Sequence, residues 1–474
     1  MAPRLLLAEH AWLGANPGMA AGVLIGVEGD RIASLETGVT QLPPGATRLS
    51  GVTLPGLVNA HSHAFHRALR GGSETGRGDF WTWREMMYSV AGVLTPDSYL
   101  ELATAVYAEM ALSGITSVGE FHYLHHDKEG TPYADPNAMG LALATAARRA
   151  GIRITLIDTC YLQAGLDGRE LEGTQKRFGD AGPEAWAARV ERLLGDAPAS
   201  GEGQFRVGVA VHSVRALDRP GMRTVAAFAA RHRVPLHVHL SEQRRENEDC
   251  LAVHGCTPTT LLSEEAVLTS HTTAVHATHL DPHDITLLGS DEVAVCACPT
   301  TERDLADGVG PFSDLRDAGS PLCIGTDSHA MIDPFEEMRG IELNERLVAN
   351  KRGLHQAPAL LDAGSYGGAR AIGWSDAGQI ALGSLADLVT VDLGSIRLAG
   401  ARAGARAGAV NTLAEQIVFA ATASDVRQLI VGGQVVVEDG HHVDLPDATG
   451  ALERALASVL DQAPPATRRS GGRR

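Results

Sequence analysis

Short apolar runs alternate with longer helical patterns from residue 54 to about residue 378. Strands that alternate with helices are typical of parallel βαβ units, and eight such strands predict a closed (β/α)8 barrel of the TIM type. The eight apolar runs are residues 57–60, 115–119, 152–157, 206–212, 235–240, 273–277, 293–298 and 321–325.

Two of the helical patterns carry clear start and stop signals. Residues 100–111 form one, with Thr95 as the expected N-cap, Pro96 at the first helical position and Gly114 after the end. The second follows the last apolar run and covers residues 334–350. The first of these helices connects neighbouring strands of the predicted barrel, and the second follows its last strand.

Both ends of the chain have a different pattern of apolar and polar residues, with many short strand-like segments. Residues 23–27 and 32–35 flank a turn and predict a hairpin, and residues 388–393 and 426–437 predict further strands, the latter folded at Gly432-Gly433. We therefore expect a small β-sandwich domain made from residues 1–53 and 379–462, beside a catalytic barrel of residues 54–378. The Gly-Ala-Arg stretch 399–409 is expected to be a solvated loop and the tail 463–474 to be disordered.

The first barrel strand ends in a His-x-His pattern. His61 and His63 share one face of an extended strand, so both imidazoles can converge on one point beyond it. Taken alone, the pair is equally consistent with two histidines packed at a strand end. The pattern becomes informative only together with the other strand ends.

Polar residues stand at or near the ends of three later strands. They are His239 and Glu242 at strand five, His276 at strand six and Asp327 at strand eight. In (β/α)8 enzymes the active site is built from the carboxyl ends of the strands. Core packing does not readily explain four strands that carry such residues in barrel order.

Three histidines and one aspartate suit a single divalent metal ion. We expect His61, His63, His239 and Asp327 to bind one Zn²⁺ per chain, with Fe²⁺ as the other candidate. Such an ion lowers the pKa of a water molecule to about 7. Glu242 is then the candidate proton shuttle, His276 polarises the reacting group, and Asp327 doubles as an acceptor for the proton of the attacking water.

The composition excludes several other functions. A chain with a net charge of −17 lacks the excess of basic residues that is typical of nucleic-acid-binding proteins. No apolar run is long enough for a membrane span. The six cysteines are scattered and no signal-peptide pattern is present, so we expect a reduced cytoplasm, with Cys296 and Cys298 as buried thiols. Serine-nucleophile and phosphate-loop motifs are absent.

The remaining histidines are expected to be structural. His237 alternates with His239 and should pack between strand and helix. Loop positions are expected to place the others at the surface: His125, His126, His279 and His329.

The whole pattern, except the tail, resembles the amidohydrolase superfamily: His-x-His on strand one, His on strands five and six, and Asp on strand eight, beside a split β-sandwich. Binuclear members use a lysine on strand four, but residues 209–215 contain none. The resemblance therefore implies the mononuclear deaminase branch, whose strand five carries His-x-x-Glu as His239 and Glu242 do.

Within that superfamily the chain is similar to the formimidoylglutamate deiminase family of histidine breakdown. The matching stretches are residues 59–65, 80–84, 119–123, 212–215 and 298–302. The resemblance implies that the glutamate portion of the substrate is bound by Arg84, Tyr123, His212 and Arg215. At His66 the relatives often have Gln in contact with substrate, so His66 either keeps that role or shifts the preference.

The chemistry implied is hydrolysis of N-formimino-L-glutamate to N-formyl-L-glutamate and ammonia, by a cytoplasmic homodimer. Two arginine forks suit the two carboxylates of this small-molecule substrate. One alternative is another deaminase of the same branch, acting on a purine, pyrimidine or triazine ring. A second is a non-catalytic barrel that serves as a scaffold, which the complete set of candidate ligands disfavours.

Overall fold

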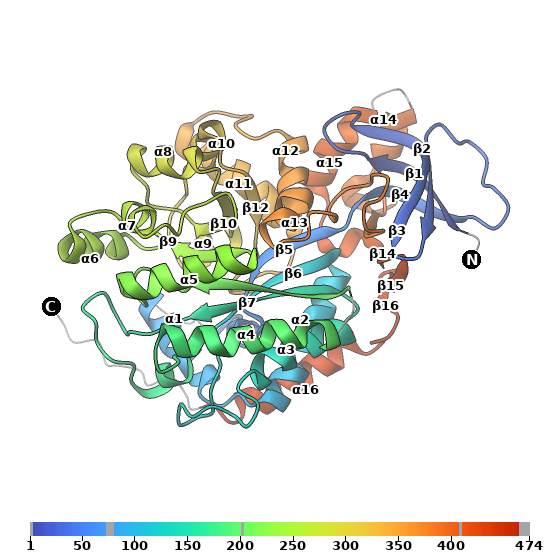
Figure 1. Ribbon diagram of the computed structural model, residues 1–474. Coiled ribbons are helices and arrows are strands. Elements are labelled where there is room, and N and C mark those ends of the chain that lie inside the picture. Colours follow the sequence, from blue (N-terminus) through green and yellow to red (C-terminus); the bar gives the residue numbers. More distant parts are fainter. Residues whose placement is uncertain (1–2, 73–79, 201–202, 407–409, 464–474) are drawn as a thin grey trace.

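A computed structural model describes residues 3–72, 80–200, 203–406 and 410–463. Eight parallel strands form a barrel in sequence order, at the left of Figure 1, which confirms the predicted fold class. The barrel strands are β5 (Leu57–Ser62), β6 (Ile115–His122), β7 (Arg153–Cys160), β8 (Phe205–Val211), β9 (Leu236–Leu240), β10 (Thr272–His276), β11 (Ala294–Ala297) and β12 (Leu322–Ile324).

The barrel closes between its first and last strands at the candidate site itself. The backbone N–H of Asp327 donates to the carbonyl of His61 at 3.0 Å, and the N–H of His63 donates to the carbonyl of Asp327 at 3.3 Å. Three of the predicted metal ligands therefore lie on the seam that joins the two strands.

Helices surround the barrel and connect its strands. Among them are α1 (Phe80–Ala91), α2 (Pro96–Leu112), α3 (Ala138–Arg149), α4 (Pro183–Ser200), α5 (Arg219–His232), α6 (Arg244–His254), α7 (Pro258–Glu264), α8 (Pro282–Ser290) and α11 (Pro334–Ala349). Thr95 is the N-cap of α2, as predicted, and it also forms a capping box with Ser98. Short helical segments complete the ring: η1 (Ala64–Leu69), η2 (Gly173–Arg177), α9 (Pro299–Asp304), α10 (Phe312–Ala318), α12 (Ala357–Asp362), η3 (Ala363–Gly367) and α13 (Gly368–Ala371).

The two ends of the chain combine in one mixed sheet, at the right of Figure 1. In spatial order it contains β16 (His441–His442), β15 (Gln434–Glu438), β14 (Val426–Val431), β13 (Leu388–Val391), β4 (Thr47–Pro55), β1 (Arg4–Trp12), β2 (Met19–Glu28) and β3 (Arg31–Glu36). β4 pairs with β1 and with β13, which joins the N-terminal and C-terminal strands. The domain boundaries placed at residues 53 and 378 stay predictions.

A buried ion pair attaches this sheet to the barrel. Arg153, at the start of β7, donates from Nε and Nη2 to the carboxylate of Asp387 at 3.0 Å each. The N–H of Gly432 donates to the same carboxylate at 2.6 Å. The two parts of the molecule are thus held by a charge pair whose polar atoms are satisfied.

The Gly-Ala-Arg stretch is not simply a loop, so that expectation was wrong. It contains α14 (Ala401–Arg406), in which Ala401 and Ala405 are buried. Alanine has the highest intrinsic helix propensity, and two alanines four positions apart present one small apolar face. Residues 407–409 and the predicted disordered tail from residue 464 onward lie outside the described residues.

The C-terminal part of the chain adds a few more elements. They are η4 (Ile396–Leu398), η5 (Val410–Thr412), α15 (Leu413–Ala420), η6 (Ala423–Asp425) and α16 (Ala448–Leu460). α16 packs against α2 (Figure 1). None of the described helices has both the length and the hydropathy needed to cross a membrane.

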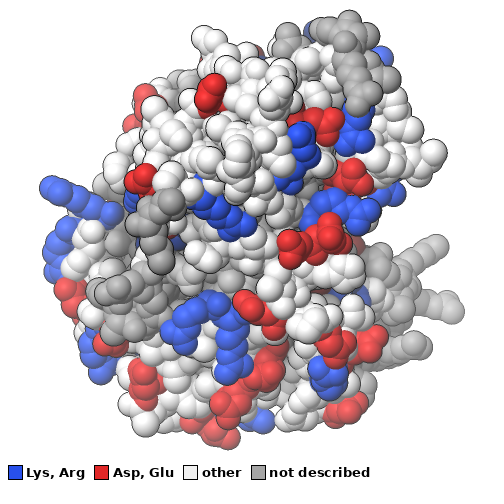
Figure 2. Space-filling model, turned by 90° about the vertical axis from the view of Figure 1, so that its right-hand side faces the viewer, with Lys and Arg blue, Asp and Glu red and all other residues white. Residues whose placement is uncertain are grey.

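Acidic and basic side chains are interspersed on the face that carries the terminal sheet (Figure 2). The net charge of the whole chain is −17, but its acidic side chains do not form one continuous acidic surface on this face.

Candidate active site

Four predicted metal ligands come together at the mouth of the barrel. The candidate donor atoms of His61, His63, His239 and Asp327 all lie within 4.8 Å of one another, and all four residues are buried. Asp327 Oδ1 lies 3.3 Å from His61 Nε2 and 3.4 Å from His63 Nε2. The Nε2 atoms of His61 and His239 are 3.1 Å apart.

Two of the imidazoles are held so that their lone pairs face this centre. Nδ1 of His63 donates to the carbonyl of Phe121 at 2.8 Å, and Nδ1 of His239 donates to the carbonyl of His212 at 3.0 Å. Because a carbonyl can only accept, the neutral rings carry their proton on Nδ1 and an unprotonated Nε2. This outer hydrogen bond is the usual support of a metal-binding histidine.

The spacing of the donor atoms fits a small divalent ion. Ligands about 2.0–2.1 Å from a tetrahedral zinc ion are about 3.3 Å from each other. The three separations of 3.1, 3.3 and 3.4 Å match that edge length. The donor set, three imidazole nitrogens and a carboxylate, suits Zn²⁺ or Fe²⁺.

Local backbone geometry aims two of the site residues. His276 and Asp327 have φ values of 69° and 43°, a left-handed conformation that costs a non-glycine residue free energy. Asp327 is steadied by its neighbour Thr326, whose N–H donates to Asn59 Oδ1 at 2.9 Å and whose Oγ1 accepts from Asn59 Nδ2 at 2.7 Å. The strained turn is thus fastened to β5.

Glu242 and His276 lie beside the four ligands. Glu242 Oε1 is 3.8 Å from His276 Nε2, which is itself 3.8 Å from Asp327 Oδ2. Burial raises the pKa of Glu242 above its ordinary value. A buried carboxyl group with a raised pKa is suited to accept and return a proton near neutral pH.

Two carboxylates that the sequence did not single out support these residues. Glu302 of α9 places Oε1 3.5 Å from His276 Nδ1 and accepts from the N–H of Cys298 at 2.9 Å. Although burial alone would lower the pKa of His276, nearby carboxylates, Glu242 foremost, raise it to about 10. Glu246 of α6 accepts from Arg215 Nε at 2.7 Å and from the N–H of Ser241 at 2.9 Å.

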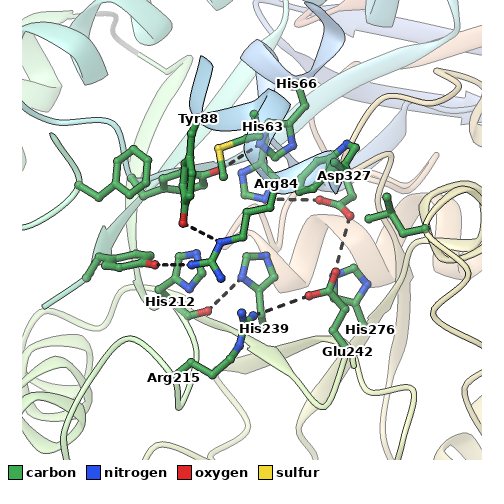
Figure 3. Close-up of a pocket in the computed structure, with 16 residues that line it drawn as sticks. His63, His66, Arg84, Tyr88, His212, Arg215, His239, Glu242, His276 and Asp327 are labelled. Atoms are coloured by element: carbon green, nitrogen blue, oxygen red, sulfur yellow. Dashed lines mark hydrogen bonds and ion pairs between the residues drawn. The ribbon is translucent and has the colours of Figure 1, made fainter. Parts of the chain in front are cut away.

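All five residues expected to contact substrate line one pocket that also contains Glu242, His276 and Asp327 (Figure 3). They are His66, Arg84, Tyr123, His212 and Arg215. The guanidinium groups of Arg84 and Arg215 both point into this pocket (Figure 3). Arg84 comes from α1, whereas Arg215 follows β8.

The pocket wall also contains aromatic residues that the sequence did not identify. Trp83 and Tyr88 of α1, Tyr161 after β7, and Phe178 after η2 all line it. None of them stands at a strand end with a metal-ligand pattern. Only Trp83 could have been found from the sequence, because it lies in residues 80–84, one of the stretches that carry the family resemblance.

Some histidines expected at the surface are buried, so those expectations were wrong. His329 is held by Thr326 Oγ1 at 2.9 Å and Ser62 Oγ at 3.2 Å, and His125 Nε2 donates to the carbonyl of Thr159 at 3.0 Å. His126 is also buried, with Nε2 3.6 Å from Asp180. In each case a polar partner compensates for the lost hydration.

Other expectations about buried residues are confirmed. His237 is fully buried, and its Nε2 donates to the carbonyl of Ala371 on α13 at 2.9 Å. Cys296 and Cys298 are free and buried. His279, half-buried, is less exposed than expected.

Comparisons with known proteins agree with this fold. The model of the amidohydrolase family matches residues 52–436. A formimidoylglutamate deiminase of Pseudomonas aeruginosa is 37% identical over 427 residues, which cover 88% of this chain and 91% of that protein. A 5-methylthioadenosine/S-adenosylhomocysteine deaminase of Natronomonas pharaonis is 31% identical over 409 residues, 85% of each chain.

A solved structure shows the same architecture. The crystal structure of an amidohydrolase from Brucella melitensis superposes with a TM-score of 0.87 and 33% sequence identity, covering 96% of this chain and 100% of that one. Since the family model spans most of the sequence and a curated relative is 37% identical over 88% of the chain, this chain belongs to the amidohydrolase family.

Proposed function

We propose that this protein is a metal-dependent deiminase that hydrolyses N-formimino-L-glutamate. Water adds to the amidine carbon, the C–N bond to the terminal nitrogen breaks, and N-formyl-L-glutamate and ammonia are released. The 37% identity to a formimidoylglutamate deiminase supports this choice of substrate.

The observation that carries the proposal is the pair of arginines in the pocket. Arg84 and Arg215 point into the cavity that also contains Glu242 (Figure 3). An arginine binds a carboxylate through two parallel N–H donors, and two arginines match a substrate with two carboxylates. A neutral ring compound has no group that would use both.

His61, His63, His239 and Asp327 would hold one Zn²⁺ or Fe²⁺ per chain. When bound there, such an ion acts as a Lewis acid that lowers the pKa of water to about 7. The residues of the chain do the remaining work of binding and proton transfer.

Glu242 is the proposed proton carrier. It takes a proton from the attacking water and gives it to the nitrogen that leaves as ammonia. His276, 3.8 Å from Glu242 and 3.8 Å from Asp327, polarises the amidine. Asp327 accepts the second proton of the same water and returns it to that nitrogen, which completes ammonia.

His66, Tyr123 and His212 shape the pocket around the glutamate portion. His66 Nε2 and Tyr123 Oη are hydrogen-bonded at 2.9 Å, so these two side chains act as one unit. Because His66 lines the same pocket, we propose that it takes the substrate-contacting role that the resemblance assigns to a glutamine at this position.

A second candidate is deamination of an aromatic ring, as the name of the Natronomonas relative states for that protein. The lining of Trp83, Tyr88, Tyr161 and Phe178 favours this alternative because aromatic side chains can stack on a base. A non-catalytic scaffold is disfavoured by the buried cluster of four candidate ligands next to Glu242.

Ammonia release across a small panel separates these candidates. The panel contains N-formimino-L-glutamate, N-formimino-L-aspartate, guanine, adenosine and cytosine, with the metal-supplemented full chain. We expect rapid release from formimino-glutamate, with N-formyl-L-glutamate as product. Faster release from a ring compound would overturn the proposal, and no release from any would favour the scaffold.

The resemblance also implies a homodimer, a cytoplasmic location and a place in histidine breakdown. These stay predictions, and the oligomeric state is open to direct measurement by light scattering.

A further inference from the structure

The guanidinium group of Arg84 is held by two tyrosines of the pocket wall. Its Nε donates to Tyr88 Oη at 2.6 Å, and its Nη2 donates to Tyr161 Oη at 3.3 Å (Figure 3). Tyr88 lies one turn further along α1, whereas Tyr161 follows β7. Arg84 is therefore fixed by the barrel as well as by its own helix.

Gln175 of η2 contacts both tyrosine hydroxyls. Its Nε2 lies 3.2 Å from Tyr88 Oη and 3.3 Å from Tyr161 Oη. A side-chain amide nitrogen carries two N–H groups, one for each oxygen. Each phenol oxygen thus faces two N–H donors, one from Arg84 and one from Gln175.

This arrangement decides where the two hydroxyl protons go. A hydroxyl oxygen has two lone pairs and one O–H donor, and two N–H donors occupy both lone pairs. The proton of each tyrosine must therefore point to a third group that accepts. Burial raises the pKa of Tyr88, so this hydroxyl keeps its proton at any physiological pH.

Both tyrosines line the pocket in which Arg84 lies. Arg84, Tyr88 and Tyr161 together present a positive charge and two oriented O–H groups to its contents. Donors of this kind match a carboxylate, which when ionised can only accept hydrogen bonds.

We propose that Tyr88 and Tyr161 are substrate-binding residues that donate their hydroxyl protons to the same substrate carboxylate that Arg84 binds. Gln175 is a positioning residue that keeps both protons turned towards the pocket. The proposal rests on the proposed function and deepens it, because it assigns one carboxylate to this group of residues. Arg215, whose Nε is bound to Glu246, is left for the other carboxylate.

The test measures binding of N-formyl-L-glutamate by calorimetry together with turnover of N-formimino-L-glutamate. Tyr88→Phe and Tyr161→Phe should each weaken binding about 10-fold or more, the usual effect of removing a hydrogen bond to a charged group. Tyr366→Phe is the matched control, since Tyr366 lies on η3 and does not line this pocket. It should bind as the parent does.

The same two substitutions are then made in an Arg84→Met background. If the hydroxyls contact the carboxylate, each should still weaken binding at least 3-fold. If they only orient Arg84, they should have no further effect once the guanidinium is gone, and the proposal would be overturned.

Gln175 provides a second, independent pair of variants. Gln175→Glu places acceptors next to both hydroxyls and draws their protons away from the pocket, so it should weaken binding more than Gln175→Leu. Equal binding by the parent and Gln175→Glu would contradict the proposal even if the tyrosine variants folded poorly.

Failure of this inference is distinguishable from failure of the proposed function. If the parent turns over the substrate and the phenylalanine variants bind as well as the parent does, only the assignment of the two tyrosines is overturned. If binding falls in those variants but the parent does not turn over N-formimino-L-glutamate, the assignment of the carboxylate site stands and the proposed reaction is overturned. A parent that neither binds nor turns over these compounds would overturn both.

Discussion

The Nε2 atoms of His61 and His239 face each other at 3.1 Å. Nδ1 of His239 donates to the carbonyl of His212, so the Nε2 of the neutral ring presents a lone pair to His61. Nε2 of His61 and Oδ1 of Asp327, which lie 3.3 Å apart, complete a cluster of potential metal ligands around one point. A divalent cation at that point would satisfy all of them.

Metal analysis of the purified protein should find about one ion per chain. Exhaustive treatment with a chelator should abolish turnover, and Zn²⁺ or Fe²⁺ should restore it. His239→Asn should lower the metal content because it removes an imidazole ligand. Two tightly held ions per chain would contradict the mononuclear site.

Replacing Glu242 by Gln should separate proton transfer from metal binding. Glu242→Gln keeps the shape of the side chain but cannot accept a proton, so turnover should fall by about 10²–10⁴-fold. Metal content and thermal stability should stay close to those of the parent. Turnover within a few-fold of the parent would remove Glu242 from the mechanism.

Glu302 should affect catalysis through His276. Glu302→Gln keeps an oxygen for the N–H of Cys298 but removes the carboxylate charge 3.5 Å from His276 Nδ1. We expect kcat to fall about 10–100-fold, the usual effect of losing such an orienting group, with little change in KM.

Glu337→Gln is the matched control for Glu302. Glu337 is equally buried and accepts hydrogen bonds from the backbone and side chain of Thr300, whereas its described hydrogen-bond and ion-pair partners do not include His276. Its loss should lower stability and leave kcat unchanged. Equal losses of kcat in both variants would make the role of Glu302 structural.

An ion pair outside the pocket predicts a pH dependence of stability. Arg189 of α4 donates to both carboxylate oxygens of Asp158 at 2.6 and 2.9 Å. Burial alone would raise the pKa of Asp158, but Arg189 lowers it from 3.8 to about 2. Since the folded pKa lies below the unfolded one, the stabilisation is complete above about pH 4 and is lost as the pH falls towards 2.

This shift corresponds to about 2–3 kcal/mol of the free energy of unfolding at neutral pH. Urea unfolding of the parent and of Asp158→Asn should therefore differ by at least that amount at pH 7. The difference should narrow as the pH falls below 4. A difference that does not change with pH would show that Asp158 contributes only packing.

The sequence predicted the fold because apolar periodicity reports burial directly. All eight barrel strands overlap the predicted runs, and the hairpin of β2 and β3 lies where residues 23–35 predicted it. The prediction was wrong at residues 399–409, where α14 forms although glycine and arginine suggested a solvated loop. Packing of Ala401 and Ala405 decides that helix, and packing cannot be read from composition.

The candidate ligands were predictable because each one stands at the end of a strand. No strand end marks three other residues of the site, which are Tyr88, Glu246 and Glu302. They lie on helices, and the position of these helices near the pocket depends on the tertiary fold. Tyr161 follows a strand, but a single tyrosine there is also common in a core. Resemblance supplied Arg84, and only the structure supplies the residues that hold it.

Arg84 and Arg215 are proposed to select an amidine with two carboxylates. Arg84→Met and Arg215→Met should each lower kcat/KM for N-formimino-L-glutamate by about 30-fold or more, because loss of one partner of a desolvated charge pair costs about 2–5 kcal/mol. Lysine at either position keeps the charge but loses the fork, so it should give an intermediate value.

The most direct measurement compares kcat/KM of the parent and both methionine variants on N-formimino-L-glutamate and on a simple formamidine without carboxylates. We predict that the variants lose activity on the first compound only, with metal content unchanged, and that the parent hydrolyses the second poorly. Equal losses on both compounds would make the arginines structural and would contradict the claim.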